Sequence, residues 1–212
     1  MKNIAIYGAG GFGQEIACAL RVIPEWKEKW NFIGYFDDSL KKNHTIYNDI
    51  ILGNLEELNK WSSELDIVIC IGDPHIVEKI SLSITNPYIS FPNLIRPEIF
   101  FYKKEDFIIG KGNILNARAI SCNVKIGDFN CFNGDISIGH DTAIGSYNII
   151  MPSVNISGNA SIGNKNFIGV SATILQGIKI GENVKIGAGG VLMRNTKDFS
   201  LYIGNPALKI KL

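Results

Sequence analysis

Large apolar residues recur at every sixth position through the second half of the chain. Stepping by six from Ile108 meets a large apolar side chain every time, with no insertion: Ile108, Ile114, Ile120, Ile126, Phe132, Ile138, Ile144, Ile150, Ile156, Ile162, Ile168, Ile174, Ile180, Ile186 and Leu192. An α-helix needs a period of about 3.6 and a flat strand a period of about 2, so neither explains this pattern. A hexapeptide repeat predicts a β-solenoid in which each short strand buries one of these residues on the axis.

The repeat also predicts how the coils stack. Three hexapeptides make one coil if the cross-section is triangular, and neighbouring coils lie about 4.8 Å apart, the normal spacing between strands. Residues 18 positions apart in the sequence should therefore lie on the same face or corner, one coil above the other.

The first hundred residues follow a different pattern, in which strand-like and helix-like segments alternate. We expect strands over 3–7, 31–36 and 67–71, and helices over 14–22, 55–61 and 75–84. The run at 67–71 is continuously apolar, as in a strand buried on both faces of a parallel sheet. This alternation predicts a small α/β domain with a parallel sheet.

A connector with two prolines, residues 90–97, separates the two patterns. We therefore expect two domains. Residues 1–97 form the α/β domain, and residues 98–212 form the solenoid with a C-terminal tail.

Composition and charge exclude several classes of partner. The net charge is +1, which gives no electrostatic reason to expect nucleic acid or a membrane surface. The longest apolar run is far shorter than the roughly 20 residues of a membrane span, and no signal peptide is visible after Met1. We expect a cytoplasmic protein with no membrane span and no nucleic-acid partner.

Cysteine and histidine spacing argues against a metal site. The four cysteines contain no CxxC pair and are expected to be reduced thiols, mostly in the core. The three histidines show no spacing typical of zinc ligands.

A glycine-rich turn, GAGGFG at 8–13, follows the first strand and opens the first helix. Such a turn offers unpaired backbone N–H groups to phosphate. The acidic pair Asp37 and Asp38 ends the next strand, where a dinucleotide fold places an acid on ribose. Alone this would suggest NAD, but the domain has room for only one mononucleotide-binding half. A structural turn without a ligand is the alternative.

The hexapeptide array, IGHD at 138–141 and the ending YIGNPA at 202–207 resemble the sugar O- and N-acyltransferases of the left-handed β-helix superfamily. YGAGGFG at 7–13, YFDD at 35–38, Ile71–Gly72 and FPNLI at 91–95 are similar to the branch with an N-terminal nucleotide-sugar-binding domain. That branch includes UDP-amino-sugar acetyltransferases and sialic acid O-acetyltransferases. The resemblance implies a Rossmann-like α/β domain followed by an all-β left-handed parallel β-helix, in a homotrimer.

His140 is the candidate catalytic residue. It takes the third place of its hexapeptide, where the family's turns leave a side chain outside the prism. Acetyl transfer from a thioester requires the accepting amine or hydroxyl to lose a proton, and a neutral imidazole accepts protons near pH 7. Asp141 follows at once and can orient the ring. The alternative is a polar corner residue in solvent.

The resemblance also implies the binding residues. A uridine nucleotide sugar would contact Gly10, Gly11, Phe12, Asp37, Asp38 and Gly72. Many relatives carry a histidine where Phe12 stands, which removes a polar contact to the sugar or diphosphate.

Acetyl-CoA would be a co-substrate, with no permanently bound cofactor, in the groove between neighbouring β-helices. It would contact Gly158, Val170 and Ala188. Gly158 should lie directly above His140 and leave room for the thioester, whereas Val170 and Ala188 share one corner.

The expected function is acetyl-CoA-dependent acetylation of the amino group of a nucleotide-linked sugar, with UDP as the nucleotide. O-acetylation of sialic acid or another sugar hydroxyl is the alternative, because the same base would serve both. Two hypotheses come from other functional classes. One is an NAD-dependent enzyme or NAD sensor, and the other is a solenoid used only for assembly or regulation.

Overall fold

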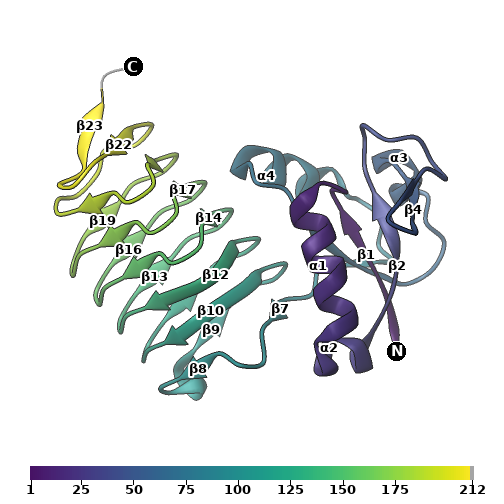
Figure 1. Cartoon of the computed structure of the whole chain (residues 1–212), viewed down its shortest axis with the longest axis horizontal. Helices are drawn as coiled ribbons and strands as arrows, with labels where there is room; N and C mark the ends of the chain where they lie inside the picture. Colours follow the sequence, from purple (N-terminus) through teal and green to yellow (C-terminus); the bar gives the residue numbers. More distant parts are fainter. Residues whose placement is uncertain (211–212) are drawn as a thin grey trace. The chain divides into compact units, whose positions relative to one another are not determined.

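The computed structural model describes residues 1–210 and divides into two compact units (Figure 1). The first unit is Met1–Pro92, and the second begins at Asn93. The sequence placed this division at residue 97, inside the same connector.

The first unit is an α/β domain built on one sheet. Its elements are β1 (Lys2–Tyr7), α1 (Gly11–Val22), α2 (Pro24–Lys29), β2 (Trp30–Phe36), β3 (Thr45–Ile46), β4 (Asp49–Gly53), α3 (Leu55–Asn59), β5 (Leu65–Ile69), α4 (Pro74–Ser83) and β6 (Ile89–Ser90). The strands run in the order β3-β4-β2-β1-β5-β6, and all neighbours are parallel except β3 and β4. The predicted α/β domain is confirmed.

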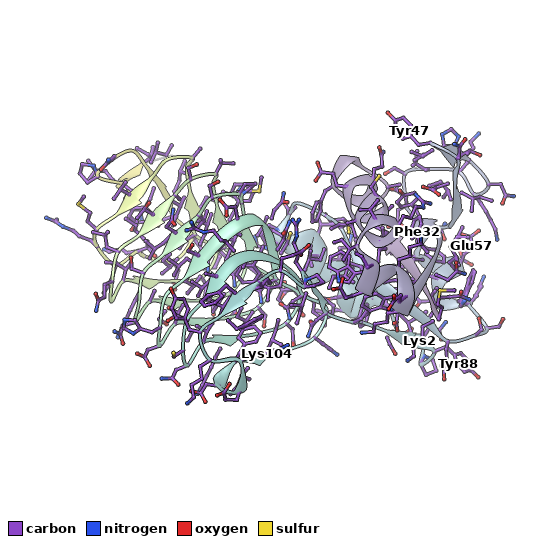
Figure 2. All side chains as sticks on the ribbon, turned by 60° about the horizontal axis from the view of Figure 1, so that its bottom comes forward. Lys2, Phe32, Tyr47, Glu57, Tyr88 and Lys104 are labelled. Carbon is purple, nitrogen blue, oxygen red and sulfur yellow. The ribbon has the colours of Figure 1, made fainter. Side chains whose placement is uncertain are left out.

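Four elements of this unit escaped the sequence pattern. Helix α2 has six residues, too few for a visible apolar period, and begins with Pro24 while burying Trp26. Strands β3 and β4 form a hairpin in place of the helix that usually joins parallel strands, and β6 adds a two-residue edge. At the hairpin turn, the Tyr47 side chain projects into solvent and is 84% exposed (Figure 2).

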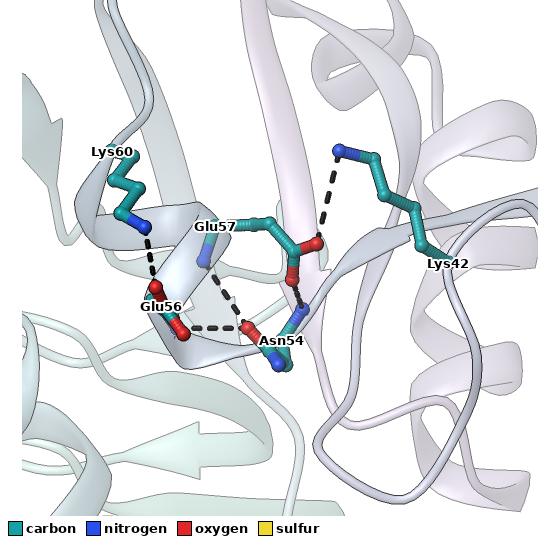
Figure 3. Close-up of polar contacts among 5 residues, drawn as sticks. All are labelled: Lys42, Asn54, Glu56, Glu57 and Lys60. Carbon is teal, nitrogen blue, oxygen red and sulfur yellow. Dashed lines mark hydrogen bonds and ion pairs between the residues drawn. The ribbon is translucent and has the colours of Figure 1, made fainter.

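Helix α3 is held by its N-terminal cap (Figure 3). The Asn54 side chain accepts hydrogen bonds from the backbone N–H groups of Glu56 and Glu57, at 2.9 and 3.2 Å. The Glu57 carboxylate in turn accepts a hydrogen bond from the backbone N–H of Asn54 at 2.7 Å. This capping box satisfies donors that a five-residue helix would otherwise leave exposed, so the turn after β4 is well defined.

The second unit is a parallel β-helix of short strands. They are β7 (Leu94–Ile95), β8 (Phe100–Phe101), β9 (Ile108–Ile109), β10 (Ile114–Ile120), β11 (Lys125–Ile126), β12 (Cys131–Ile138), β13 (Ala143–Ile144), β14 (Ile149–Ile150), β15 (Asn155–Ile156), β16 (Ser161–Ile162), β17 (Phe167–Ile168), β18 (Thr173–Ile174), β19 (Lys179–Ile180), β20 (Lys185–Ile186), β21 (Val191–Leu192), β22 (Leu201–Ile203) and β23 (Leu208–Ile210). A 3₁₀ turn, η1 (Lys104–Asp106), precedes β9.

These strands form three faces. The first face is β9-β11-β13-β16-β19. The second runs from β7 through the first halves of β10 and β12 to β14, β17, β20 and β22, which pairs with β23 in antiparallel fashion. The third runs from β8 through the second halves of β10 and β12 to β15, β18 and β21. The corners that follow these faces stack into a first, second and third edge. The predicted parallel β-helix is confirmed.

The six-residue step fails at its first two positions. Ile108 is 57% exposed, and Ile109 instead lies beside Ile126. Leu115, not Ile114, lies beside Phe132. From Ile120 onward the expected residues occupy the core. The reason is a register shift within β10, which leaves one residue fewer between Leu115 and Ile120 than in later coils. Because alternate strand residues face opposite ways, this one-residue slip exchanges the inward and outward positions.

Every sixth residue adopts a left-handed backbone conformation. From residue 123 to residue 189 the φ angle at these corners lies between +49° and +75°, at Asn123, Phe129, Asp135, Asp141, Tyr147, Ser153, Asn159, Lys165, Ser171, Gly177, Asn183 and Gly189. Asparagine, aspartate and glycine tolerate this conformation best, whereas aromatic and long side chains take it only when the surrounding structure requires it. The triangular coil therefore imposes the conformation on whichever residue stands there.

A ladder of buried asparagines runs along the first edge. The side-chain oxygen of each one accepts the backbone N–H of the next, from Asn93 through Asn113, Asn130, Asn148 and Asn166 to Val184, at 2.7–2.9 Å. Between asparagines the Nδ2 group donates to the same oxygen. Buried polar groups are costly unless paired, so the ladder is stable only as a continuous chain.

We expect Asn148→Ala to destabilise the β-helix by about 2–4 kcal/mol, because it removes the acceptor of two buried donors on Asn166. The thermal unfolding midpoint, measured at fixed protein concentration, should fall by roughly 5–15 °C. Asn155→Ala is the control, since its side chain is exposed and donates a hydrogen bond to the Ser153 carbonyl outside the ladder. Equal midpoints for both variants would contradict a stabilising ladder.

Candidate active site

His140 lies at the third edge, in the corner that follows β12. Two backbone hydrogen bonds fix this corner between its neighbouring coils. The Asp141 N–H donates to the Cys122 carbonyl at 2.9 Å, and the Asn159 N–H donates to the His140 carbonyl at 2.8 Å. Asp141 is itself a left-handed corner residue, with φ +55°. The backbone that carries His140 and Asp141 is therefore held by coils on both sides.

The two side chains contact each other. His140 Nδ1 lies 2.8 Å from Asp141 Oδ2, and Asn123 Nδ2 donates to Asp141 Oδ1 at 2.9 Å. The bonds from His140 and then Asn123 lower the pKa of Asp141. A hydrogen on Nδ1 suits this contact and leaves Nε2 of a neutral imidazole as an acceptor. The His140 side chain is 52% exposed, so an incoming group can reach the imidazole ring.

Gly158 lies directly against the His140 ring. A Cβ atom at this position would be 2.6 Å from His140 Nε2 and 2.7 Å from Cε1. The space expected above His140 is thus filled by the imidazole. The missing side chain of Gly158 makes room for the imidazole, and its expected contact with acetyl-CoA stays a prediction.

Val170 and Ala188 stack on another edge. Both are exposed residues of the second edge, and the Gly189 N–H donates to the Val170 carbonyl at 2.8 Å. Within one chain, this edge and the His140 edge flank the third face. The structure therefore brings His140, Asp141 and Gly158 together and places Val170 and Ala188 apart from them.

The third face carries a hollow that the sequence did not indicate. It has a volume of about 590 Å³ and includes Phe100, Tyr102, Arg118, Ser137, Asn155 and Ser157 in its lining. Phe100 and Tyr102 pack edge to face and are 60% and 67% exposed. Gly139 also lines the hollow, so it extends to the corner of His140.

The glycine turn of the first unit divides into structural and open positions. A Cβ at Gly8 would be 2.7 Å from the Cys70 carbonyl, and one at Gly13 would be 2.0 Å from the Gly8 carbonyl. These two glycines allow α1 to approach β1 and β5 closely. Gly10, Gly11 and Gly72 instead face open space, since a Cβ there would meet nothing within 4 Å, and the N-cap Gly10 supplies no side-chain cap to α1. The first N–H groups of α1 are therefore open to a ligand.

Asp37 and Asp38 lie at the carboxyl edge of the sheet, as expected, but both already accept backbone hydrogen bonds. Asp37 accepts from Ala9 and Ser39, each at 2.9 Å, and Asp38 accepts from Leu55 at 3.0 Å. Burial and then Asp38 raise the pKa of Tyr7 above its usual range. Asp37 thus shapes the glycine turn, and the sequence missed this role.

A second hollow, of about 610 Å³, extends along α1 from Gly11. Its walls include Cys18, Tyr35 and the ion pair between Arg21 and Asp49. Burial, with Asp49 beside the ring, raises the pKa of Tyr35 to about 12. Phe12 is half-buried in the first turn of α1. The sequence pattern did not indicate this second hollow.

Across residues 1–210, no cluster of three or more His, Cys, Asp or Glu side chains could hold a metal ion. In that same range, no helix has the length and apolar composition needed to cross a membrane.

Two family descriptions match the chain. Residues 3–84 match the PglD N-terminal domain, and residues 159–194 match the bacterial transferase hexapeptide, in six repeats. No curated protein sequence matches.

Solved structures match over the whole chain. The acetyltransferase domain of PglB from Neisseria gonorrhoeae FA1090, in complex with acetyl coenzyme A, is 26% identical, with a TM-score of 0.85 and 99% of each chain covered. A histidine-to-asparagine variant of perosamine N-acetyltransferase from Caulobacter crescentus, in complex with CoA and GDP-perosamine, is 24% identical, with a TM-score of 0.87; 100% of this chain and 98% of that one are covered. WeeI from Acinetobacter baumannii AYE is 24% identical, with a TM-score of 0.88 and 99% and 100% covered. The predicted family resemblance and the fold class are confirmed.

We expect Gly158→Ala to displace the His140 ring, because the new Cβ would overlap Nε2 while the backbone at this position suits any residue. The contact between Nδ1 and Asp141 should break with little loss of stability, since the ring can swing into solvent. A crystal structure of the variant measures this displacement. An unmoved ring would contradict the close approach of Gly158.

Proposed function

We propose that this chain, in which a PglD N-terminal domain precedes a hexapeptide-repeat β-helix, transfers the acetyl group of acetyl-CoA to the amino group of a nucleotide-linked amino sugar. The observation that carries the proposal is the His140 imidazole, which is held through Nδ1 by Asp141 and belongs to a half-exposed side chain. Relatives of the same architecture support it. One is an acetyltransferase domain with bound acetyl coenzyme A, and another has bound CoA and GDP-perosamine.

His140 acts as the general base. The sugar amine attacks the thioester carbonyl carbon, a C–N bond forms, and His140 Nε2 takes the proton that the nitrogen loses. The tetrahedral intermediate then collapses with cleavage of the C–S bond, and His140 returns the proton to the departing sulfur. Asp141 stabilises the imidazolium that exists between these steps. The products are an acetamido sugar and CoA with a free thiol.

Each unit has a separate binding task. The open N-terminus of α1, with Gly10, Gly11 and Phe12, binds the diphosphate and sugar. Asp37, Asp38 and Gly72 lie at the same edge and bind the nucleoside. The resemblance implies uridine, whereas the Caulobacter relative was crystallised with GDP-perosamine, so both nucleotides belong in the test.

A homotrimer completes the donor site. Val170 and Ala188 are on a different edge from His140, and a neighbouring copy that brings its second edge to the third edge of the first would place both sets beside one acetyl-CoA. That arrangement covers the third face, where the exposed rings of Phe100 and Tyr102 lie. Repetition of one such contact closes a ring.

We expect His140→Ala to lower kcat by about 100- to 10,000-fold, because the base is lost while the binding groups remain. The measurement is release of free thiol from acetyl-CoA with UDP- and GDP-linked amino sugars, sialic acid and CMP-sialic acid as acceptors. His44→Gln is the matched control, because His44 lies in a hydrophilic loop of the first unit.

The acceptor panel separates the readings. Release with an amino sugar that vanishes in His140→Ala supports the proposal and identifies the nucleotide. Release with sialic acid alone would assign the protein to O-acetylation. Unchanged turnover in His140→Ala would refute the assigned base, and tight NAD binding without acetyl transfer would favour a dinucleotide protein.

Sedimentation equilibrium should give a mass of three 23.3 kDa chains at micromolar concentration, because the proposed contact joins unlike edges and closes a ring when three copies repeat it. A stable monomer that still releases thiol would show that one chain holds the complete site.

A further inference from the structure

Asp141 has two carboxylate oxygens, and each has its own partner. Oδ2 faces His140 Nδ1 at 2.8 Å, and Oδ1 accepts a hydrogen bond from Asn123 Nδ2 at 2.9 Å. Asn123 is 18 positions before Asp141, at the same corner one coil earlier. Both residues have nearly the same left-handed backbone, with φ of +57° and +55°. The repeat itself therefore sets the distance between the amide and the carboxylate.

We propose that Asn123 is a positioning residue of the acetyl transfer, which acts on His140 by holding Asp141 in the orientation that receives the hydrogen of Nδ1. The proposal rests on the proposed function of the same site. The hexapeptide pattern by itself gives Asn123 no role, because that role depends on its contact with Asp141 in the next coil.

Exposure makes such a support necessary. The side chains of His140 and Asp141 are 52% and 47% exposed, so packing alone does not immobilise them. A carboxylate with one partner can rotate toward water and release the imidazole. With Asn123 bound to the second oxygen, rotation of the Asp141 carboxylate breaks two hydrogen bonds instead of one.

Gly158 limits the ring from the opposite side. A Cβ atom on Gly158 would overlap Nε2 and Cε1 of His140, so the ring lies directly against the backbone of this residue. The imidazole is thus bounded by one coil through Asn123 and Asp141 and by the next coil through Gly158. Together these contacts fix both the tautomer and the direction in which Nε2 points.

An asparagine meets both requirements of this position. It tolerates the left-handed backbone better than most residues, and its amide donates a hydrogen bond without adding charge. An ionised aspartate would keep the shape and backbone preference, but it has no hydrogen to donate and brings a second negative charge against Asp141. These two properties can be separated by substitution.

The test compares three variants of the full chain. Asn123→Gly removes the amide and keeps the backbone unstrained, Asn123→Asp keeps the shape without a donor, and Asn123→Lys restores a donor on a residue type that adopts φ +57° at Lys165. Asn183→Gly is the control, because it removes a corner asparagine with φ +55° from the first edge. Thermal unfolding midpoints show whether each variant keeps its fold.

We expect Asn123→Gly and Asn123→Asp to lower kcat by about 3- to 15-fold with KM nearly unchanged, the factor that one hydrogen bond of ordinary net strength supplies. Asn123→Lys should recover most of this loss, and Asn183→Gly should match the wild type. In ¹⁵N-histidine spectra, the His140 signal should move from the Nδ1–H tautomer toward a mixture in the Gly and Asp variants. His140→Gln identifies that signal among the three histidines.

Wild-type kcat and an unchanged His140 tautomer in both Asn123→Gly and Asn123→Asp would overturn the proposal. A fall in kcat equal to that of Asn183→Gly, or matched by a lower unfolding midpoint, would also overturn it, because the role would then be structural. The tautomer is read without substrate. If the wild type transfers no acetyl group, the proposed function fails, while the spectra still decide whether Asn123 controls His140.

Discussion

The left-handed backbone at every sixth residue is the constraint on which the β-helix depends. It turns the chain at each corner, so that three short strands close one coil and the next coil lies in register above it. Residues with very different preferences, from Asn123 to Phe129 and Lys165, accept the same φ. Their agreement shows that stacking of the whole coil decides the local conformation, against the intrinsic preference of individual residues.

The same register builds the candidate site. Asn123 and Asp141 meet because they are equivalent residues of successive coils, and Gly158 meets His140 for the same reason. No loop excursion or long-range crossing is needed to assemble these groups. A constraint on backbone closure thus also determines which side chains contact one another, so the geometry of the candidate site and the stability of the fold have a common origin.

The sequence predicted what depends on spacing and missed what depends on local register. The hexapeptide period and the glycine turn identified both units, and the family resemblance of IGHD at 138–141 indicated the neighbours His140 and Asp141. Asn123 could have been found by counting one coil back from Asp141. The slip that exposes Ile108 could not, because Ile109 and Leu115 are as apolar as their neighbours. Likewise, the pattern around Asp37 gave no sign that its carboxylate would accept the Ala9 N–H.

The asparagine ladder makes the two ends of the solenoid unequal. The side-chain oxygen of each asparagine accepts a hydrogen bond from the following coil. The series stops at Val184, whose N–H donates to the Asn166 oxygen and whose side chain has no acceptor for another coil. Whole coils could be duplicated or deleted within the ladder during evolution without leaving a rung unmatched. Beyond Val184 the rule changes, and the antiparallel β22–β23 hairpin ends the stack there instead. The change from asparagine to valine along the first edge therefore marks the coil at which the ladder of the β-helix ends.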